Sequence, residues 1–369
     1  MSIAHSEGGA AMRINRAELT AEIVRPDALD VAEIAAWREF MALTPSLAAP
    51  FLSYPYVVAA SRAFHKVRVC VIRSGRRPVG FFPFQYAGPL HRVAGIGERL
   101  GGELSDYFGL VAAPELKVDP CQLLRMSRLR ALLFTHLDAD QARFGLSGEN
   151  SEPGLRTRYE DGGPAFWQNL RASDKKFVSD TERRQRKLAE DFGSLNFVFR
   201  HVNPLPQLYE LIARKRDQYQ RTDVKDVLAQ QKVRRFLGEL VSLDTPDCRA
   251  VLSTLHAGKT WVASHFGLIY GSTLHYWFPV YNPALRSYAP GRILIKSIIE
   301  APEAAMISCI DRGQGDTPSK RDFANESHVF QRGVWQRPGG IALAFRIGLS
   351  LRWRLESRRM PLGSRSGAA

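Results

Sequence analysis

The segment 274–305, LHYWFPVYNPALRSYAPGRILIKSIIEAPEAA, contains the residues best placed for chemistry. An aromatic run and a short loop precede Pro290-Gly291, which opens an apolar helix. The first N–H groups of a helix have no intrahelical partner and lie at the positive end of its dipole, so they can bind phosphate. Gly291 allows close approach of the backbone, and Arg292 and Lys296 add positive charge. The junction predicts a phosphate-binding turn, although Pro and Gly also begin helices that bind no ligand.

Signals for several other chemistries are absent from the sequence. It has no G-x-x-x-x-G-K-[ST] loop, no H-E-x-x-H and no G-x-S-x-G, and the glycines of 95–102 follow no clear strand-to-helix junction. The four cysteines lie far apart within apolar runs, which predicts reduced core residues and no metal site. They are Cys70, Cys121, Cys248 and Cys309. Neither a dinucleotide enzyme nor a metalloenzyme is therefore expected.

Length and composition fit a folded protein of two domains. The 369 residues are 45% hydrophobic and 24% charged, which is ordinary globular usage. The formal net charge of +14 favours polyanionic partners such as nucleic acid, anionic lipid or a phosphorylated cofactor, but it does not choose among them. Part of the excess lies in 175–187, which is either a solvated helix face or a grip for an anionic acceptor such as a nucleotide-sugar, a lipid-linked sugar or tRNA.

Neither end of the chain carries an export or membrane signal. Residues 1–16 lack an apolar core after a basic start and are expected to be disordered, and no run of about 18 apolar residues occurs. A cytoplasmic protein is expected. The basic tail 338–369 contains an alternating segment, 341–355, that fits either a strand or a helix. Its arginines face solvent or an anionic surface, such as the inner face of a membrane.

Hydrophobic periodicity predicts the same order of elements twice. The first series comprises a strand at 19–26, helices at 29–44 and 54–64, a hairpin about Ser74-Gly75, a strand at 106–114, a helix at 121–130 and a strand at 131–139. The second series runs from 195 to 313 as strand, two helices, three strands, helix and strand. Between them 145–163 breaks the pattern, and one helix is predicted over 166–192. The expectation is an α/β (α+β) chain with two units, 17–160 and 161–337, each a mixed twisted sheet flanked by helices.

This order, with a phosphate-ready helix after the third strand of a meander, resembles GNAT-type acetyltransferases. More narrowly, the sequence resembles the tandem-domain group of bacterial cellulose and polysaccharide biosynthesis, which is related to Fem-type transferases. The resemblance is carried by Tyr281-Asn282-Pro283, Tyr288-Ala289-Pro290-Gly291, the helix 292–305 and Asp311-Arg312-Gly313-Gln314-Gly315-Asp316, with Ser105-Asp106-Tyr107 and the basic 183–188 upstream. The group usually has Asp in place of Asn282, Ser in place of Ala289, and a Tyr-Lys pair where this chain has Ser319-Lys320.

The resemblance implies that acyl-CoA lies in a splayed gap between the strands 274–280 and 307–312, with its pyrophosphate on the Gly291 turn. The cofactor residues are then Tyr288, Pro290, Gly291, Arg292 and Lys296. Acyl transfer needs a base and a donor to the leaving thiolate or developing oxyanion, and no metal. Candidates near the gap are His265, Tyr276, Tyr281, Asp311 and Asp316, among which the histidine is the natural base. Each also fits a structural role, as a core histidine, a packed tyrosine or a turn-capping aspartate.

The two units are expected to divide the work. The first has no glycine where its matching helix begins, near Asp119-Pro120, so it is expected to shape the acceptor site. Asp106 and Tyr107 from this unit, and Lys320 from the second, are the predicted acceptor-binding residues. The expected reaction transfers an acyl group, taken to be acetyl, from acyl-CoA to an amine or hydroxyl of a polysaccharide or cell-envelope precursor. Two alternatives stay open: a Fem-like transferase that uses aminoacyl-tRNA, and an inactive accessory subunit that docks on a membrane polysaccharide synthase through its basic tail.

Overall fold

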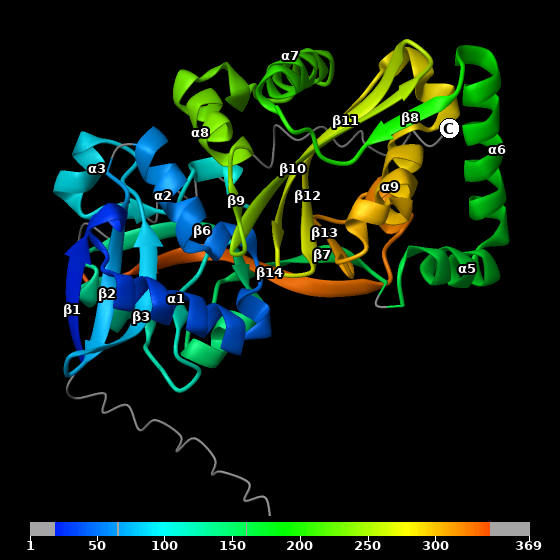
Figure 1. Ribbon diagram of the computed structural model, residues 1–369. Helices are drawn as coiled ribbons and strands as arrows, with labels where there is room; N and C mark the ends of the chain where they lie inside the picture. Colours follow the sequence, from blue (N-terminus) through cyan, green and yellow to red (C-terminus); the bar gives the residue numbers. More distant parts are fainter. Residues whose placement is uncertain (1–18, 65, 160, 340–369) are drawn as a thin grey trace, which may run out of the picture.

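A computed structural model describes residues 19–64, 66–159 and 161–339 of the chain, and Figure 1 shows two α/β halves joined side by side. The first half contains β1 (Leu19–Val24), α1 (Val31–Leu43), α2 (Tyr54–Ala63), β2 (Arg68–Ser74), β3 (Arg77–Phe84), α3 (Pro89–Ala94), β4 (Ile96–Glu98), β5 (Val111–Ala112), α4 (Pro120–Met126), β6 (Ala131–Asp138) and β7 (Asn150–Arg158). The predicted segments 1–16 and 341–355 lie outside the described residues.

The second half contains α5 (Gly163–Ser173), α6 (Lys175–Phe192), β8 (Leu195–Val198), α7 (Leu205–Arg221), α8 (Gln231–Val241), β9 (Asp244–Thr245), β10 (Cys248–Ala257), β11 (Thr260–Tyr270), β12 (Thr273–Tyr281), α9 (Pro290–Glu300), β13 (Cys309–Gln314), α10 (Pro318–Arg321) and β14 (Glu326–Gln336). The predicted order of strand, two helices, meander, helix and strand is present in both halves. The mixed α/β fold class is therefore confirmed.

Two local predictions are wrong. The strand predicted at 106–114 is reduced to Val111–Ala112 and an isolated bridge between Phe108 and Leu137. The single helix predicted over 166–192 is two helices, because Asp174 leaves helical geometry at φ −140° and its side chain accepts a hydrogen bond from the N–H of Phe177. An aspartate at this position caps the start of α6 and ends α5.

The halves exchange strands within one ten-stranded sheet. Its order is β4-β6-β14-β7-β13-β12-β11-β10-β8, with β9 paired to β10. The last strand of the described residues, β14, thus lies between two strands of the first half, and β7 lies between two strands of the second half. A separate sheet has the order β1-β2-β3-β5. The segment 145–163, where the sequence pattern breaks and the domain boundary was predicted, contains the nine residues of β7.

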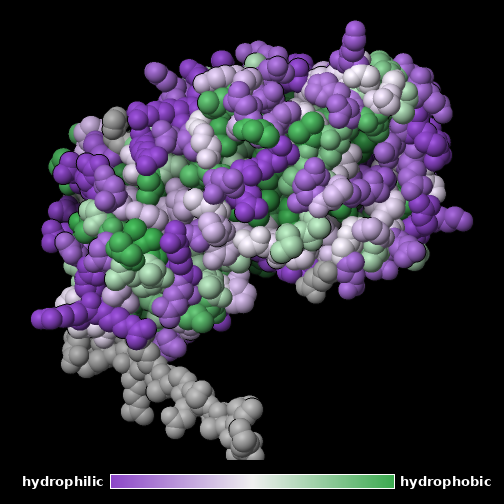
Figure 2. Space-filling model, in the orientation of Figure 1, coloured by the Kyte–Doolittle hydropathy of each residue, from purple (hydrophilic) through white to green (hydrophobic). Residues whose placement is uncertain are grey.

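Two hydrophobic clusters cover opposite faces of the second half's sheet. In β10, Leu252 belongs to the cluster that includes α7, α8 and the core of the first half, and its neighbour Val251 belongs to the cluster that includes α9. Because alternate residues of a strand point to opposite faces, α7 and α9 lie on opposite sides of the sheet. Figure 2 shows the outer surface in the same orientation, where apolar areas are separate and surrounded by hydrophilic residues. Every helix in the described part of the chain is too short or too polar to span a bilayer.

Candidate functional site

The two central parallel strands of the second half separate partway along their length. β12 and β13 pair at three positions, and the last pair is His275 with Asp311. Beyond this pair β12 continues beside β11 as far as Tyr281, whereas β13 remains paired only with β7, on its other side. The separation opens a gap in the sheet, in agreement with the splayed gap that the sequence resemblance implies.

A pocket of about 700 Å³ occupies this gap. Residues from both faces of the sheet line it: Asp180 and Arg184 of α6, Lys215 and Gln218 of α7, Tyr276, Pro279 and Tyr281 of β12, Arg286, Ala289, Pro290, Gly291, Arg292 and Ile295 at the start of α9, Arg312 of β13, and Pro318, Ser319, Asp322 and Phe323 after it. Because α7 and α9 lie on opposite faces, a ligand in the pocket can be reached from both sides. Such a pocket can hold a donor on one face and an acceptor on the other.

The start of α9 is shaped for a close ligand. Ala289 precedes it in the left-handed conformation, with φ 53°, and Pro290 occupies the first helical position. A Cβ atom built on Gly291 would meet no other heavy atom within 4 Å, so this position opens on the pocket. Unpaired N–H groups and the helix dipole favour an anion at such a terminus. The residues present therefore fit the pyrophosphate of a CoA-type donor.

The predicted cofactor residues divide into two groups. Pro290, Gly291 and Arg292 line the pocket, and the Nε atom of Arg292 donates to Asp322 at 2.9 Å. The structure does not bring Lys296 or Tyr288 to it. Lys296 lies five residues after Gly291, about 140° around the helix, and its ammonium pairs with Glu300 over the ring of Trp167.

Tyr288 also lies outside the pocket lining, on the side of α6. Its hydroxyl donates to Asp191 at 2.5 Å, and its ring meets the edge of Phe192 with centroids 5.7 Å apart. This tyrosine therefore fastens the turn before α9 to the end of α6. It supports the site from outside.

The predicted base, His265, is fully buried behind the pocket wall. Its ring stacks on Tyr276, with centroids 4.3 Å apart and planes 9° apart, and Tyr276 stands between it and the pocket. Neither ring nitrogen has a hydrogen-bond partner among the described residues. Burial lowers the pKa of His265 to about 3, so it is neutral at physiological pH. Its assignment as general base stays a prediction.

Several residues that line the pocket were not predicted as site residues, and three of them are polar groups that a ligand can meet: Lys215, Gln218 and Arg312. Lys215 and Gln218 are one helical turn apart on α7, and Arg312 follows Asp311 on β13. The Nζ atom of Lys215 donates to the carbonyl of Pro279 at 2.7 Å, and burial lowers its pKa to about 8. Two features of the sequence could have identified these residues. Lys215 and Gln218 are polar residues spaced i, i+3 on an amphipathic helix, and Arg312 is an arginine inside an apolar strand.

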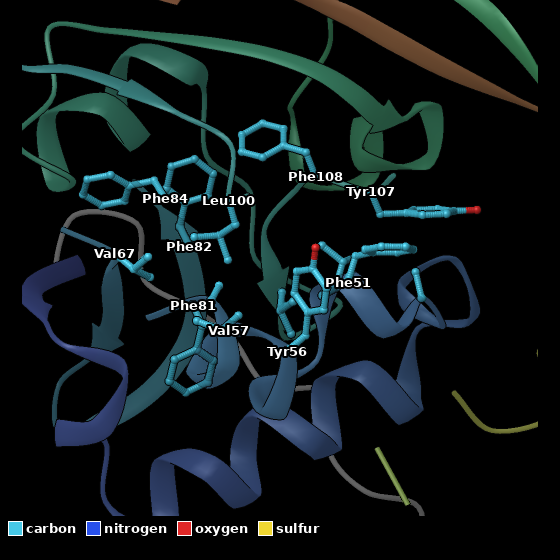
Figure 3. Packing of buried hydrophobic residues seen from close by; sticks show 14 of the residues in the cluster. Phe51, Tyr56, Val57, Val67, Phe81, Phe82, Phe84, Leu100, Tyr107 and Phe108 are labelled. Atoms are coloured by element: carbon cyan, nitrogen blue, oxygen red, sulfur yellow. The ribbon is translucent and has the colours of Figure 1, made fainter. Parts of the chain in front are cut away.

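A second cluster of polar residues lies where the two halves meet. Nε2 of His275 is 2.9 Å from Oδ2 of Asp106, and Asp311 accepts hydrogen bonds from Tyr107 and, at 3.1 Å, from Nε of Arg156. In Figure 3 the hydroxyl of Tyr107 points away from the surrounding hydrophobic side chains, while its ring lies against that of Phe51. Three predicted site residues, Asp106, Tyr107 and Asp311, thus come together here and not in the pocket.

The remaining predicted residues are near the mouth of the gap. Tyr281 lines the pocket and is 38% exposed. Asp316 is exposed and forms an ion pair with Arg321, so it is a surface residue of the loop after β13. The Nζ atom of Lys320 donates to the carbonyl of Gln314 at 2.5 Å, and Asp106 raises the pKa of Lys320 against the larger lowering by burial. Lys320 therefore belongs electrostatically to the junction between the halves.

The corresponding gap of the first half is closed by Gln141. Where the strand segment at Phe108 leaves β6, the side-chain amide of Gln141 accepts from the N–H of Leu110 at 2.9 Å and donates to its carbonyl at 3.1 Å. A Cβ atom on Gly109 would lie 2.5 Å from this amide. The side chain replaces the missing strand partner and fills the space, so the open gap belongs to the second half.

Comparison with known proteins agrees with this geometry. Residues 175–321, which include α6, the meander, α9 and β13, match the family model described as an acetyltransferase (GNAT) domain. The second half therefore contains a GNAT-fold acetyltransferase domain. No curated protein matched the sequence.

Solved structures share the fold at low sequence identity. The C-terminal domain of a putative lysylphosphatidylglycerol synthetase from Agrobacterium fabrum aligns over 80% of this chain and 91% of its own, with 11% identity and a TM-score of 0.50. FemX aligns over 80% of this chain and 93% of its own, with 9% identity and a TM-score of 0.51. A tandem GNAT protein of clavulanic acid biosynthesis aligns over 87% of this chain and 100% of its own, with 13% identity and a TM-score of 0.49.

Within the described residues no group of three or more His, Cys, Asp or Glu side chains could hold a metal ion.

Proposed function

We propose that this protein is an acyltransferase whose donor is an acyl-CoA. The observation that carries the proposal is the pocket that passes through the gap between β12 and β13, with the start of α9 at one face and α7 at the other. The pyrophosphate of the donor binds at Pro290 and Gly291, the thioester lies in the gap, and the acceptor approaches along α7. Helix N-termini bind anions through their free N–H groups, and ligands commonly occupy clefts of this kind, so both features support the proposed site.

The proposed reaction is direct transfer. The acceptor amine or hydroxyl attacks the thioester carbon, a C–N or C–O bond forms, the C–S bond breaks, and the proton lost by the acceptor ends on the thiolate of CoA. Lys215 lines the α7 side of the pocket, and its pKa of about 8 makes the neutral amine available as a base near neutral pH. Tyr281 at the mouth contacts a ligand directly, whereas His265 acts only through Tyr276.

The acceptor class rests on the sequence resemblance. On this basis the acceptor is an amine or hydroxyl of a polysaccharide or cell-envelope precursor. The reaction takes place in the cytoplasm, where CoA thioesters are available. The transferred group is acetyl, the simplest acyl chain. Asp106, Tyr107 and Lys320 would then serve the acceptor by holding the first half against β13. Attachment to a membrane or synthase through the tail 338–369 belongs to the same proposal.

Binding of CoA to variants at Gly291 tests the proposal. Gly291→Ala adds one methyl group in open space and is expected to keep or raise stability, because alanine favours helix more than glycine. It should weaken CoA binding, and Gly291→Asp should abolish it by adding negative charge where the pyrophosphate approaches. Gly238→Ala on α8, also in open space and outside the pocket, is the matched control.

Isothermal titration with CoA and thermal melts of the same samples give the readout. A specific ligand of the folded protein raises the melting temperature by mass action. Normal CoA affinity in folded Gly291→Asp would remove the start of α9 from the site. Absence of CoA binding to the unaltered chain would overturn the proposed donor.

An aminoacyl-tRNA donor is the alternative that a specific observation favours. Five cationic side chains and two acidic ones line the pocket, and the chain carries a net charge of +14. Binding to tRNA should fall steeply with salt, because neutralised phosphates release counterions. Competition of tRNA with CoA at the pocket would favour this donor, and binding of neither donor would favour the inactive accessory subunit.

A further inference from the structure

Arg312 is a buried guanidinium fixed in one position in the pocket wall. It is 9% exposed, its NH2 atom donates to the carbonyl of Ser319 at 3.2 Å, and its guanidinium carbon lies 5.1 Å from the ring centre of Tyr276. The ring of His265 supports Tyr276 from behind. The stack of two rings and a guanidinium holds Arg312 without an ordinary salt bridge.

One nitrogen of this side chain has no partner. NH1 of Arg312 is buried and makes no hydrogen bond to any described residue, and Arg312 forms no ion pair within the described part of the chain. Leaving a charged donor unpaired away from water costs free energy, and a native protein tolerates it where a ligand supplies the partner. Since Arg312 lines the pocket, the ligand that occupies the pocket is the expected partner.

The acids nearby are already engaged. Asp322 accepts from Arg292, and Asp180 accepts from Arg183 and Arg184. The charge of Asp322 raises the pKa of Arg312 against the larger lowering by burial, but neither carboxylate forms an ion pair with Arg312 within the described residues. A neutral carbonyl oxygen would satisfy the hydrogen bond but not the charge. A carboxylate satisfies both, because its two oxygens match the spacing of guanidinium N–H groups.

The place of Arg312 limits where that carboxylate lies. Arg312 directly follows Asp311, the residue at which β12 and β13 stop pairing, and so it stands at the narrow end of the gap. Its guanidinium lies over the ring of Tyr276, five residues before the end of β12, whereas the α9 terminus follows that end through the turn Pro283–Tyr288. Gln218 on α7 also lines the pocket, and its buried Oε1 atom, which makes no hydrogen bond to any described residue, can accept one from an amine or hydroxyl. The offset along β12 favours an anion at Arg312 other than the donor phosphates.

We infer that the substrate carries a carboxylate, on the transferred acyl chain or on the acceptor, and that Arg312 binds it. The inference rests on the proposed acyltransferase function and specifies its substrate class. Arg312 selects a dicarboxylic acyl thioester or an acceptor that is an amino acid or hydroxy acid, and a simple acetyl donor with an uncharged acceptor leaves its charge unpaired.

The first arm of the test varies the donor. Succinyl-CoA and butyryl-CoA have acyl chains of equal length and differ by the terminal carboxylate. Isothermal titration should show that the unaltered chain binds succinyl-CoA about 10- to 100-fold more tightly than butyryl-CoA if the carboxylate is on the acyl chain, as a charged hydrogen-bonded pair contributes roughly 1.5–3 kcal/mol.

The second arm varies the acceptor. With acetyl-CoA as donor, CoA release is measured with amino acids and with the matching amino acid amides, which lack the carboxylate. A preference of the same size for the acids over the amides places the carboxylate on the acceptor. A preference in neither arm overturns the inference.

Variants at Arg312 assign the preference to this residue. Arg312→Met should abolish the preference and leave the affinity for CoA itself unchanged, and Arg312→Lys should retain part of it. Arg249→Met, which removes an exposed cation outside the pocket, is the matched control and should keep the full preference. Thermal melts verify that each variant is folded.

The outcomes separate this inference from the proposed function. CoA binding with no carboxylate preference, or a preference that survives in Arg312→Met, overturns the role of Arg312 and leaves the acyltransferase proposal standing. Failure of the unaltered chain to bind CoA overturns the proposed function and this inference with it.

Discussion

Nε2 of His275 lies 2.9 Å from Oδ2 of Asp106, although 169 positions separate the two residues in the chain. The other ring nitrogen of His275 lies 3.7 Å from Oδ1 of Asp311 without a hydrogen bond, so the imidazole stands between a carboxylate from each half. The side chain of His275 is 1% exposed and that of Asp311 is 3% exposed. The first half is thus joined to the strand that borders the pocket by a hydrogen-bonded network and not by apolar packing alone.

The acid stability of this junction should depend on Asp311. Burial alone would raise the pKa of Asp311, but the neighbouring His275 and Arg156 lower it to about 2. Its contribution to the free energy of unfolding, about 2–3 kcal/mol, is complete above the unfolded pKa of about 3.9 and is lost as the pH falls toward 2. Urea denaturation between pH 2 and pH 7 should show this loss in the unaltered chain.

Asp311→Asn should remove that dependence. It should also cost about 3–5 kcal/mol at pH 7, because it leaves the half-buried Arg156 without one of its two carboxylate partners. Glu326, which also pairs with Arg156 at 3.2 Å, limits the loss to the lower end of this range. Equal slopes for both proteins between pH 3 and pH 4 would contradict the role given to Asp311.

His265 should make the fold sensitive to acid over a higher range. Its folded pKa of about 3 lies below the unfolded value of about 6.5, so below pH 6.5 the unfolded chain binds a proton that the folded protein does not. The free energy of unfolding therefore has its full value above pH 6.5 and decreases as the pH falls toward 3. In His265→Leu, unfolding free energies measured at pH 4 and pH 7 should differ less than in the unaltered chain, on the order of a few kcal/mol less.

Turnover of the same variant tests the catalytic interpretation. Because Tyr276 separates His265 from the pocket, we expect the rate to stay within a few-fold of the original. A fall of on the order of 10²–10⁴ in a folded variant would instead support His265 as the general base, since that is the usual contribution of such a group.

Ala289 should be a strained position. It precedes α9 at φ 53°, a left-handed conformation that costs a residue with a Cβ roughly 1–2 kcal/mol. Ala289→Gly should therefore leave stability unchanged or raise it by up to about 1 kcal/mol, after the entropic cost of glycine. Ala289→Val should destabilise by more than 1 kcal/mol, since a β-branched side chain fits this region worst.

A nearby alanine provides the comparison. Ala284, in the turn Pro283–Tyr288, has no positive φ, and Ala284→Gly should lower the unfolding free energy by roughly 0.5–1 kcal/mol. Urea midpoints of the three variants measure the difference. If Ala289→Gly lowered the unfolding free energy as Ala284→Gly does, Ala289 would carry no strain.

The exchange of β7 and β14 predicts that neither half folds alone. A fragment covering 161–337 lacks β7, which pairs with both β13 and β14, so β14 and the pocket strand β13 each lose a partner. The fragment 17–160 loses β14, which pairs with β6 and β7. Unpaired strand edges aggregate, so each fragment alone should be insoluble or lack a cooperative melt, and co-expression should restore both folding and CoA binding.

The division of the chain at 160–161 is judged by the same experiment. If the fragment 161–337 melted cooperatively and bound CoA by itself, the two units would be independent domains and the strand exchange would be dispensable. Circular dichroism and titration with CoA on the isolated fragment decide between these results.

The order of elements was predictable from the sequence because it follows from local periodicity. Apolar spacing located α1, α2, α7 and α9 within a few residues, and alternation located β10, β11 and β12. The helix start at Pro290 and Gly291 was also predictable, since these residues act through the backbone of their own helix and need no distant partner. These features depend on interactions among residues close together in the chain.

Only the tertiary structure decided which residues meet. β7 and β14 escaped the sequence prediction because they are polar strands whose partners lie more than 100 residues away, so no local alternation marks them. Lys296 was expected at the pocket from its charge, but helix geometry turns it toward Trp167. Arg312 belonged to the motif that carries the family resemblance, but no role was predicted for it. Its NH1 atom, which has no partner among the described residues, belongs to a buried guanidinium that lines the pocket where the two strands separate.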